Sequence, residues 1–396
     1  MNIYFDENMP FAKSFFSGFG NLFPFAGREL TADKLIDADV LLVRSITQVN
    51  EALLINSPNI KFVGTATIGM DHIDQAYLKK SNISFSSAPG CNAISVSEYV
   101  VSSLIILSEK YQLALNKLEV GIVGGGNTGS RLAEKLTALG IAYKICDPLL
   151  ANEQQKRKES NLEPLDNRVY HSLEDVLLCD IISLHVPQIK EGKHPTYHLL
   201  NQANLCNLKD EQILISACRG PVIDNKALLM LKEQGHQLKL VLDVWEGEPN
   251  VLLPLVKYAE IATAHIAGYS LEGKSRGTEM LYQALCKELK ETPLKQLQDF
   301  LPKADISSIV LNKNGLSEQV LNQLVKLVYD VRRDDTIFRQ QLSSQGFDNL
   351  RKNYPVRREF SSVSLLCSAE LEKEKNMSLE KPKKLNQLFN VGFSKG

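Results

Sequence analysis

The sequence has no long hydrophobic run. No segment approaches the roughly 18 apolar residues that a membrane-spanning helix needs, and residues 1–6 lack the basic stretch and apolar core of a signal peptide. The 7 cysteines show no paired spacing, which argues against a disulfide scaffold and favours a reducing compartment. We therefore expect a cytoplasmic protein.

An excess of charge of one sign is also missing. Lysine and arginine total 45 against 46 acidic residues, which leaves a formal net charge of -1. This balance gives no electrostatic reason to expect a nucleic acid or a membrane surface as a partner. The 396 residues exceed one ordinary domain, and 44% hydrophobic residues is typical of a globular chain.

Short apolar runs of strand length alternate with helix-compatible stretches along most of the chain. In the first ninety residues the runs are 40–43, 61–64 and 83–85, and a periodic segment at 95–115 predicts one helix. A second alternating region has runs at 120–123, 142–145, 181–184, 213–215, 240–242 and 261–263. The pattern predicts an α/β protein with two parallel-sheet domains, Rossmann-like or flavodoxin-like, covered by helices on both faces.

The character of the sequence changes after about Glu291. Breakers at 294–302 and 312–315 precede a charged amphipathic segment at 316–338, which predicts one helix, and the lysine-rich last two dozen residues predict a loosely ordered tail. The polar stretch 190–195 predicts an inserted loop. We expect a third, smaller domain here.

The strongest local signal is a G-x-G-x-x-G loop between a strand and a helix. Gly124 permits a tight turn, Gly126 lets the backbone approach a pyrophosphate, and Gly129 lets the helix pack on the strand. Asp147, at the end of the next strand, can accept bonds from both ribose hydroxyls. No lysine or arginine occurs at 148–155 to pair with a 2′-phosphate, so we predict NAD as the cofactor rather than NADP. The predicted loop contacts are Gly124, Gly126, Asn127, Thr128 and Gly129.

Three segments at predicted strand ends offer groups for oxidising a hydroxy acid. Arg219 can hold a carboxylate, His265 can remove the hydroxyl proton, and Glu248 can orient the imidazole and favour its charged form. Each residue alone fits an ion pair or a satisfied histidine equally well, and the spacing does not decide between these interpretations.

The sequence resembles the D-2-hydroxyacid dehydrogenase family. The resemblance rests on the glycine loop with Asp147 and on the segments 184–187, 217–220, 242–245 and 264–268, in the family's order. It implies that Arg219 binds substrate, that His265 is the acid/base paired with Glu248, that Asp243 lies near the nicotinamide, and that Gly268 contacts the cofactor. The implied domains are a substrate-binding domain (1–95 and 266–290), an NAD-binding Rossmann domain (96–265) and a C-terminal α+β dimerisation domain (291–396).

A narrower resemblance is to those family members that oxidise a phosphorylated four-carbon hydroxy acid on the route to pyridoxal phosphate. It rests on the segments 6–10, 43–47, 64–69, 88–93, 266–274, 328–335 and 351–354, and it covers nearly the whole chain. It implies that Ser45, Thr67 and Tyr269 contact the substrate and that the C-terminal domain makes a homodimer. For the substrate phosphate, Arg44, Ser45 and Thr67 are candidates, as are Arg332 or Arg351 of a partner subunit, and the sequence does not choose among them.

Two other functions stay open at this point. The first is another D-2-hydroxyacid dehydrogenase, for example one acting on 3-phosphoglycerate, and the second is a non-catalytic NAD(H)-sensing binding protein. We expect no metal: His194 and His198 have a helical metal-site spacing, but Pro195 between them disfavours a helix. Cys91 lacks a neighbouring base and is interpreted as a packing or substrate-side residue, and His185 as cofactor-side or structural.

Overall fold

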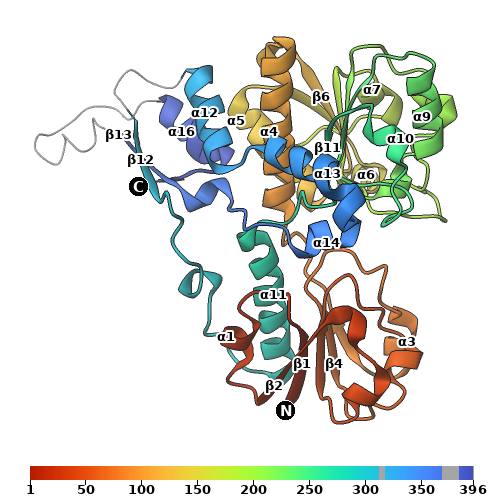
Figure 1. Ribbon diagram of the computed structural model, residues 1–396, viewed down its shortest axis with the longest axis vertical. Coiled ribbons are helices and arrows are strands. Elements are labelled where there is room, and N and C mark those ends of the chain that lie inside the picture. The colour runs from red at the N-terminus through yellow and green to blue at the C-terminus, as the bar shows by residue number, and fades with distance from the viewer. Residues whose placement is uncertain (312–316, 368–382, 396) are drawn as a thin grey trace, which may run out of the picture. The chain divides into compact units, whose positions relative to one another are not determined.

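The protein forms two compact units, each with its own parallel sheet (Figure 1). The computed structural model describes residues 1–311, 317–367 and 383–395. Unit 1 comprises Met1–Asn92 and Tyr269–Lys303, and unit 2 comprises Ala93–Gly268 and Ala304–Gly396. Within these described ranges, none of the helices combines the length and the apolar character needed to cross a bilayer.

Unit 1 contains a five-stranded sheet in the order β2-β1-β3-β4-β5, with all neighbouring strands parallel. This is the flavodoxin-like strand order, in which β2 lies on one side of β1 and all later strands lie on its other side, so that the order reverses between β1 and β3. The strands are β1 (Asn2–Asp6), β2 (Asn21–Phe25), β3 (Val40–Val43), β4 (Phe62–Thr65) and β5 (Ser84–Ser86). We did not predict β1 and β2; β2 is an edge strand that contains Pro24, which an edge tolerates.

Helices cover both faces of this sheet. One core packs α1 (Ala12–Phe16) and α11 (Leu271–Leu289) against the sheet through Phe15, Leu281 and Leu285. The other lies under α2 (Glu51–Leu54) and α3 (Gln75–Lys80). The prediction of a parallel sheet buried on both faces is therefore confirmed for this unit.

Unit 2 contains a six-stranded parallel sheet in the order β11-β10-β9-β8-β6-β7. Its strands are β6 (Glu119–Val123), β7 (Ala142–Cys146), β8 (Ile181–Leu184), β9 (Ile213–Ser216), β10 (Lys239–Leu242) and β11 (Ala259–Ala262). A single bridge from Ile145 to Tyr170 adds a rudimentary strand beyond β7. Successive strands are added on one side of β6 up to β7 and on its other side from β8 onwards, as in a Rossmann fold. Ligands of open α/β sheets bind where the strand order reverses in this way.

The helices of this sheet in unit 2 are mostly short. They are α4 (Ala93–Tyr111), α5 (Asn127–Leu139), α6 (Pro148–Glu159), α7 (Leu173–Leu177), α8 (Gln202–Leu205), α9 (Asn225–Glu233) and α10 (Leu253–Val256). The expected helix at 95–115 is α4, which begins two residues earlier and ends at Tyr111. The stretch 190–195 is a loop, as expected.

The C-terminal residues belong to the same compact unit as the six-stranded sheet. They form a three-stranded parallel sheet of β12 (Ser308–Leu311), β13 (Ser364–Cys367) and β14 (Ser394–Lys395). The helices are α12 (Glu318–Val328), α13 (Val331–Gln345), α14 (Phe347–Lys352) and α16 (Lys383–Val391). The division of the chain into three domains, with 291–396 as a dimerisation domain, stays a prediction.

Helix α13 covers β11, an edge strand of the six-stranded sheet. Asp335 accepts a hydrogen bond from the Ala262 N–H of the edge strand β11, at 2.7 Å. Arg339 donates to the carbonyls of Val256 and Ala259 at 2.9 and 2.6 Å. Because an uncovered edge strand invites pairing with another chain, these contacts protect the sheet.

Two expectations about the C-terminal region are wrong. The single helix expected at 316–338 is broken at Tyr329, whose backbone is extended, and Asp330 then caps α13 by accepting from the Arg332 N–H at 3.1 Å. The lysine-rich end contains the ordered elements α16 and β14. The rest of that expected loose tail, 373–382 and residue 396, lies outside the described residues.

Arg357 ties the C-terminal region to the rest of unit 2. This side chain is 2% exposed and lies 3.6 Å from the ring centroid of Tyr329. It donates to the carbonyls of Ala267 and Ser95 at 3.0 and 2.6 Å. Glu98, also fully buried, accepts from the Phe360 N–H. A buried charge of this kind is stable only while its partners remain in place.

We predict that Arg357→Met destabilises the protein by about 2–5 kcal/mol, because it leaves the carbonyls of Ser95 and Ala267 without a donor and removes the cation from the Tyr329 ring. Urea unfolding of the full-length chain measures the change. The exposed Lys352 offers a control, since Lys352→Met should alter stability by less than about 0.5 kcal/mol. Equal stability of the two variants would show that the Arg357 contacts contribute nothing.

Candidate active site

The glycine loop lies between β6 and α5 in unit 2. Gly124 has a φ of +100°, which favours glycine, and a Cβ on Gly129 would lie 1.9 Å from the Gly124 carbonyl oxygen. A Cβ on Gly126 would meet no atom within 4 Å, so the space beside it is open to a ligand. This geometry fits a pyrophosphate against the amino end of α5.

Asp147 lies where the sequence predicts, at the end of β7. Its Oδ2 accepts from the Gly125 N–H at 2.9 Å, and its Oδ1 accepts from the N–H groups of Leu149 and Leu150, both at 3.1 Å. Asp147 therefore caps α6 and also holds the glycine loop. Its predicted ribose contact would have to share a carboxylate that the protein already uses.

Sequence reasoning missed Arg168, which also fixes the glycine loop. Its guanidinium donates to the Gly125 carbonyl at 3.0 Å and to Ser130 Oγ at 2.7 Å, and it pairs with Asp166. No motif connects Arg168 to the loop, because the rudimentary strand at Tyr170 brings it there.

Asp243 organises the turn that presents His265. The buried carboxylate accepts from Thr263 Oγ1 at 2.6 Å and from the N–H groups of Ile266 and Ala267 at 2.8 and 2.9 Å. The His265 N–H donates to the Asp243 carbonyl at 2.7 Å. These bonds hold His265 at a φ of +56°, a conformation that a non-glycine residue adopts only when its surroundings impose it.

His265 and Glu248 form a hydrogen-bonded pair. His265 Nδ1 lies 2.7 Å from Glu248 Oε2, and Glu248 Oε1 accepts from the Trp245 N–H at 2.8 Å. Burial acts to raise the pKa of Glu248, but the neighbouring His265 and these hydrogen bonds bring the pKa below its ordinary value. An ionised carboxylate only accepts, so Nδ1 carries the hydrogen and Nε2 is left to exchange a proton with a ligand.

Arg219 lies three residues after the end of β9, the strand next to β10. The strands β9, β10 and β11 are neighbours, and Arg219, Asp243 and His265 come directly after their carboxyl ends. Arg219 Nη1 donates to the Cys218 carbonyl at 2.8 Å. Trp245, two residues after Asp243, is 1% exposed and stacks on Phe338 with ring centroids 5.6 Å apart.

The other predicted substrate residues belong to unit 1. Arg44 and Tyr269 lie together, with the Arg44 Cζ 5.8 Å from the ring centroid. Ser45 is exposed, while Thr67 Oγ1 donates to the Gly69 carbonyl at 2.9 Å. Gly268 is the last residue of this part of unit 2, next to Tyr269.

The residues set aside as non-catalytic have ordinary surroundings. Burial lowers the pKa of His185 to about 4, and its Nε2 bonds Ser183 Oγ at 2.9 Å, so this imidazole is neutral at pH 7. Burial raises the pKa of the Cys91 thiol to about 11, which disfavours the reactive thiolate.

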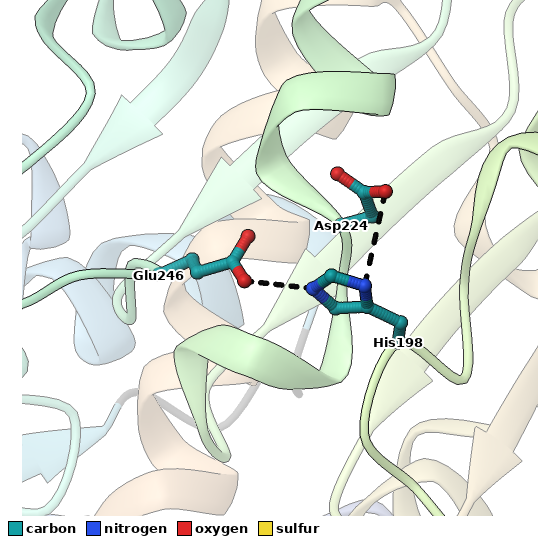
Figure 2. A group of neighbouring side chains, drawn as sticks. All are labelled: His198, Asp224 and Glu246. Atoms are coloured by element: carbon teal, nitrogen blue, oxygen red, sulfur yellow. Dashed lines mark hydrogen bonds and ion pairs between the residues drawn. The ribbon is translucent and has the colours of Figure 1, made fainter.

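Figure 2 shows His198 between two carboxylates. Its Nε2 lies 2.7 Å from Glu246 Oε1 and its Nδ1 lies 3.8 Å from Asp224 Oδ2. The three groups are close enough for a metal ion, but each ring nitrogen faces a different carboxylate. Asp224 also caps α9, and Glu246 accepts from the Asn225 N–H at 3.2 Å. These bonds account for the cluster as a junction of three segments, and the absence of a bound metal stays a prediction.

Comparisons with known proteins identify the family. Residues 103–267 match the family model described as "D-isomer specific 2-hydroxyacid dehydrogenase, NAD binding domain", and residues 300–380 match a domain of unknown function, DUF3410. The erythronate-4-phosphate dehydrogenase of Colwellia psychrerythraea is 64% identical over 381 residues, which cover 93% of this chain and 96% of that protein. The chain belongs to the erythronate-4-phosphate dehydrogenase family. Another erythronate-4-phosphate dehydrogenase, from a Shewanella species, is 47% identical and covers 100% of this chain and 99% of its own length.

Solved structures agree with this membership at the level of the broader fold. A D-lactate dehydrogenase from Aquifex aeolicus, in complex with NAD and lactic acid, is 27% identical with a TM-score of 0.58, and covers 73% of this chain and 96% of that one. A 3-phosphoglycerate dehydrogenase from Entamoeba histolytica, with bound NAD, has a TM-score of 0.61 at 20% identity over 76% of this chain and 99% of that one, and shows the fold alone. The predicted fold class, family and NAD cofactor are thus confirmed for this member of the erythronate-4-phosphate dehydrogenase family.

We predict that Gly126→Ala leaves the fold intact but weakens NAD binding at least about tenfold, roughly 1.4 kcal/mol. The added methyl meets no protein atom, so it can clash only with a ligand. Titration of NADH fluorescence measures the affinity, and thermal unfolding without cofactor is the control. Unchanged affinity would place the pyrophosphate away from Gly126.

Proposed function

We propose that this chain oxidises 4-phospho-D-erythronate with NAD⁺ to 2-oxo-3-hydroxy-4-phosphobutanoate, as a step towards pyridoxal 5′-phosphate. The observation that supports this most directly is the Glu248–His265 pair, at 2.7 Å, in the same sheet-based unit as a glycine loop suited to a dinucleotide. The names of the relatives at 64% and 47% identity support the choice of substrate.

The proposed mechanism divides the work among three side chains. His265 Nε2 removes the C2 hydroxyl proton as the C2 hydrogen departs with its electron pair. NAD⁺, when bound, accepts that hydride. Glu248 stabilises the imidazolium that forms, and Arg219 holds the substrate carboxylate through its guanidinium. Proton transfer by a positioned histidine typically contributes roughly 10²–10⁴-fold to the rate.

The proposed cofactor contacts are the residues of the glycine loop together with Asp147, Asp243 and Gly268. Gly124, Gly126, Asn127, Thr128 and Gly129 border the pyrophosphate, and Asp147 accepts from the ribose. The Asp243 carboxylate acts at the nicotinamide end mainly by holding the turn through Ile266 and Ala267. Ser45, Thr67, Tyr269 and Arg44 are the proposed substrate contacts from unit 1.

We expect the full-length protein to form NADH from 4-phospho-D-erythronate in strong preference to 3-phosphoglycerate, with a 2-oxo acid present to reoxidise retained NADH. His265→Ala should reduce turnover roughly 10²–10⁴-fold, because it removes the proton acceptor. Absorbance of NADH measures both rates.

The same His265→Ala variant should bind NAD with wild-type affinity, which separates lost chemistry from lost folding. Preference for 3-phosphoglycerate would keep the mechanism and overturn the substrate. If neither substrate gave NADH formation while NAD binding was intact, the NAD(H)-sensing alternative would be favoured. Wild-type turnover by His265→Ala would remove His265 as the acid/base.

A cytoplasmic location and a homodimer formed through 291–396 are also part of the proposal. Six cysteines in the described ranges have free thiols, which supports a reducing compartment. The dimer is supported by β12, an edge strand whose Val310 is 51% exposed, and by Ile306 beside it at 48%. Apolar side chains on an exposed strand edge are typical of an interaction surface.

We expect the full-length chain to sediment as a dimer and Val310→Asp to shift it towards monomer, because the new charge would be buried at the interface. Leu162→Asp, at an equally exposed apolar position (59%) of unit 2, is the matched control and should remain dimeric. A dimeric Val310→Asp variant would place the interface elsewhere, and a monomeric wild type would end the dimer proposal.

A further inference from the structure

Unit 1 has its own reversal of strand order, between β1 and β3. In open α/β sheets, ligands bind outside the carboxyl ends of the strands at this reversal. Asn8 follows β1 and Arg44 follows β3, and Arg44 Nη1 donates to the Asn8 carbonyl at 2.8 Å. Asp6 holds that loop in turn, since its Oδ1 accepts from the backbone and side-chain amides of Asn8 at 2.8 and 3.1 Å.

Two cations converge on one aromatic ring at this position. The Arg44 Cζ lies 5.8 Å from the Tyr269 ring centroid, and the Lys274 Nζ lies 5.4 Å from the same centroid. Lys274 comes from the first turns of α11, whereas Arg44 comes from the sheet edge. The fold thus brings together two basic side chains that are 230 positions apart in sequence.

The two cations have no acidic partner among the residues that the structure describes. Arg44 donates a hydrogen bond to the Asn8 carbonyl and contacts the Tyr269 ring. Lys274 contacts the same ring. Burial first, and repulsion by Arg44 second, lower the pKa of Lys274 to about 8. Two like charges held close together in half-buried positions are costly, and an anion that contacts both would lower that cost.

We propose that Arg44 and Lys274 together bind the phosphate group of the substrate, with the ring of Tyr269 as the surface on which both are held. This inference rests on the proposed function and names the residues of its phosphate subsite. The exposed Ser45, next to Arg44, can add a hydroxyl donor, whereas the Thr67 hydrogen is engaged by the Gly69 carbonyl.

The charge of the ligand distinguishes phosphate from carboxylate at this position. A phosphomonoester carries close to two negative charges at neutral pH and can accept bonds from both cations at once. A carboxylate carries one charge and matches a single guanidinium, which Arg219 offers in unit 2. Lys274 was not among the residues selected from the sequence, because a lysine in the first turns of a helix is ordinarily a solvated surface residue.

The test compares two substrates that differ only in the phosphate: 4-phospho-D-erythronate and D-erythronate. In the full-length enzyme with saturating NAD⁺, Lys274→Met should lower kcat/KM for the phosphorylated acid about 10- to 100-fold and leave that for D-erythronate unchanged. Arg44→Met should behave alike, and Lys274→Arg should retain most of the activity. Lys80→Met, an exposed lysine of the same unit, is the control.

Calorimetric titration of inorganic phosphate into the NAD-loaded enzyme provides a readout independent of turnover. Binding that Lys274→Met weakens and Lys80→Met does not would support the subsite even if 4-phospho-D-erythronate proved not to be the substrate. Equal losses on both substrates would assign the pair to the carboxylate and overturn the proposal. Wild-type kinetics and wild-type phosphate binding in Lys274→Met would also overturn it, and would leave the proposed function standing.

Discussion

The hydrogen bonds of the Asp243 carboxylate determine where the proposed acid/base lies. Both oxygens are used by the turn after β11, through Thr263, Ile266 and Ala267, at 2.6–2.9 Å. The turn would otherwise relax, because His265 is held in a left-handed conformation that costs of order 1–3 kcal/mol. That conformation aims Nδ1 at Glu248, so the chemistry depends on a buried side chain that need not touch the substrate.

The two sheets place their candidate functional side chains at corresponding positions. In each unit the parallel strands end at one edge of the sheet, and the strand order reverses once, at the place where open α/β sheets ordinarily bind ligands. Unit 2 places at this edge the glycine loop, Arg219 and the Glu248–His265 pair. Unit 1 places Arg44 and Lys274 there. The proton-transfer pair and a single guanidinium thus occur in unit 2, and a pair of cations without acidic partners occurs in the described part of unit 1.

The sequence was most informative where local geometry dictates residue type. Gly124 and Gly129 are required by a positive φ and a close approach, so their spacing identified the loop, and the strand ends identified Glu248 and His265 as candidates. The pairing of Glu248 with His265 could not be derived from spacing, because it depends on the turn that Asp243 holds. Arg168 and Lys274 were missed for the same reason: tertiary contacts bring each to its site, and neither lies in a local pattern. The break at Tyr329 was missed because the apolar periodicity continues through it, and the competing bond from Ser102 Oγ to the Tyr329 carbonyl, 2.9 Å, comes from another helix.

Arg357 has a consequence for the mechanics of the whole chain. Its two carbonyl acceptors, Ser95 and Ala267, are the third residue of unit 2 and the last but one before the chain returns to unit 1. One guanidinium from the C-terminal region therefore fastens two of the three chain crossings to unit 2. At these two crossings the backbone is held on the unit 2 side, up to the residues next to Asn92 and Tyr269. Loss of this one side chain would therefore release two segments that lie 172 positions apart in the sequence, and both depend on an intact C-terminal region.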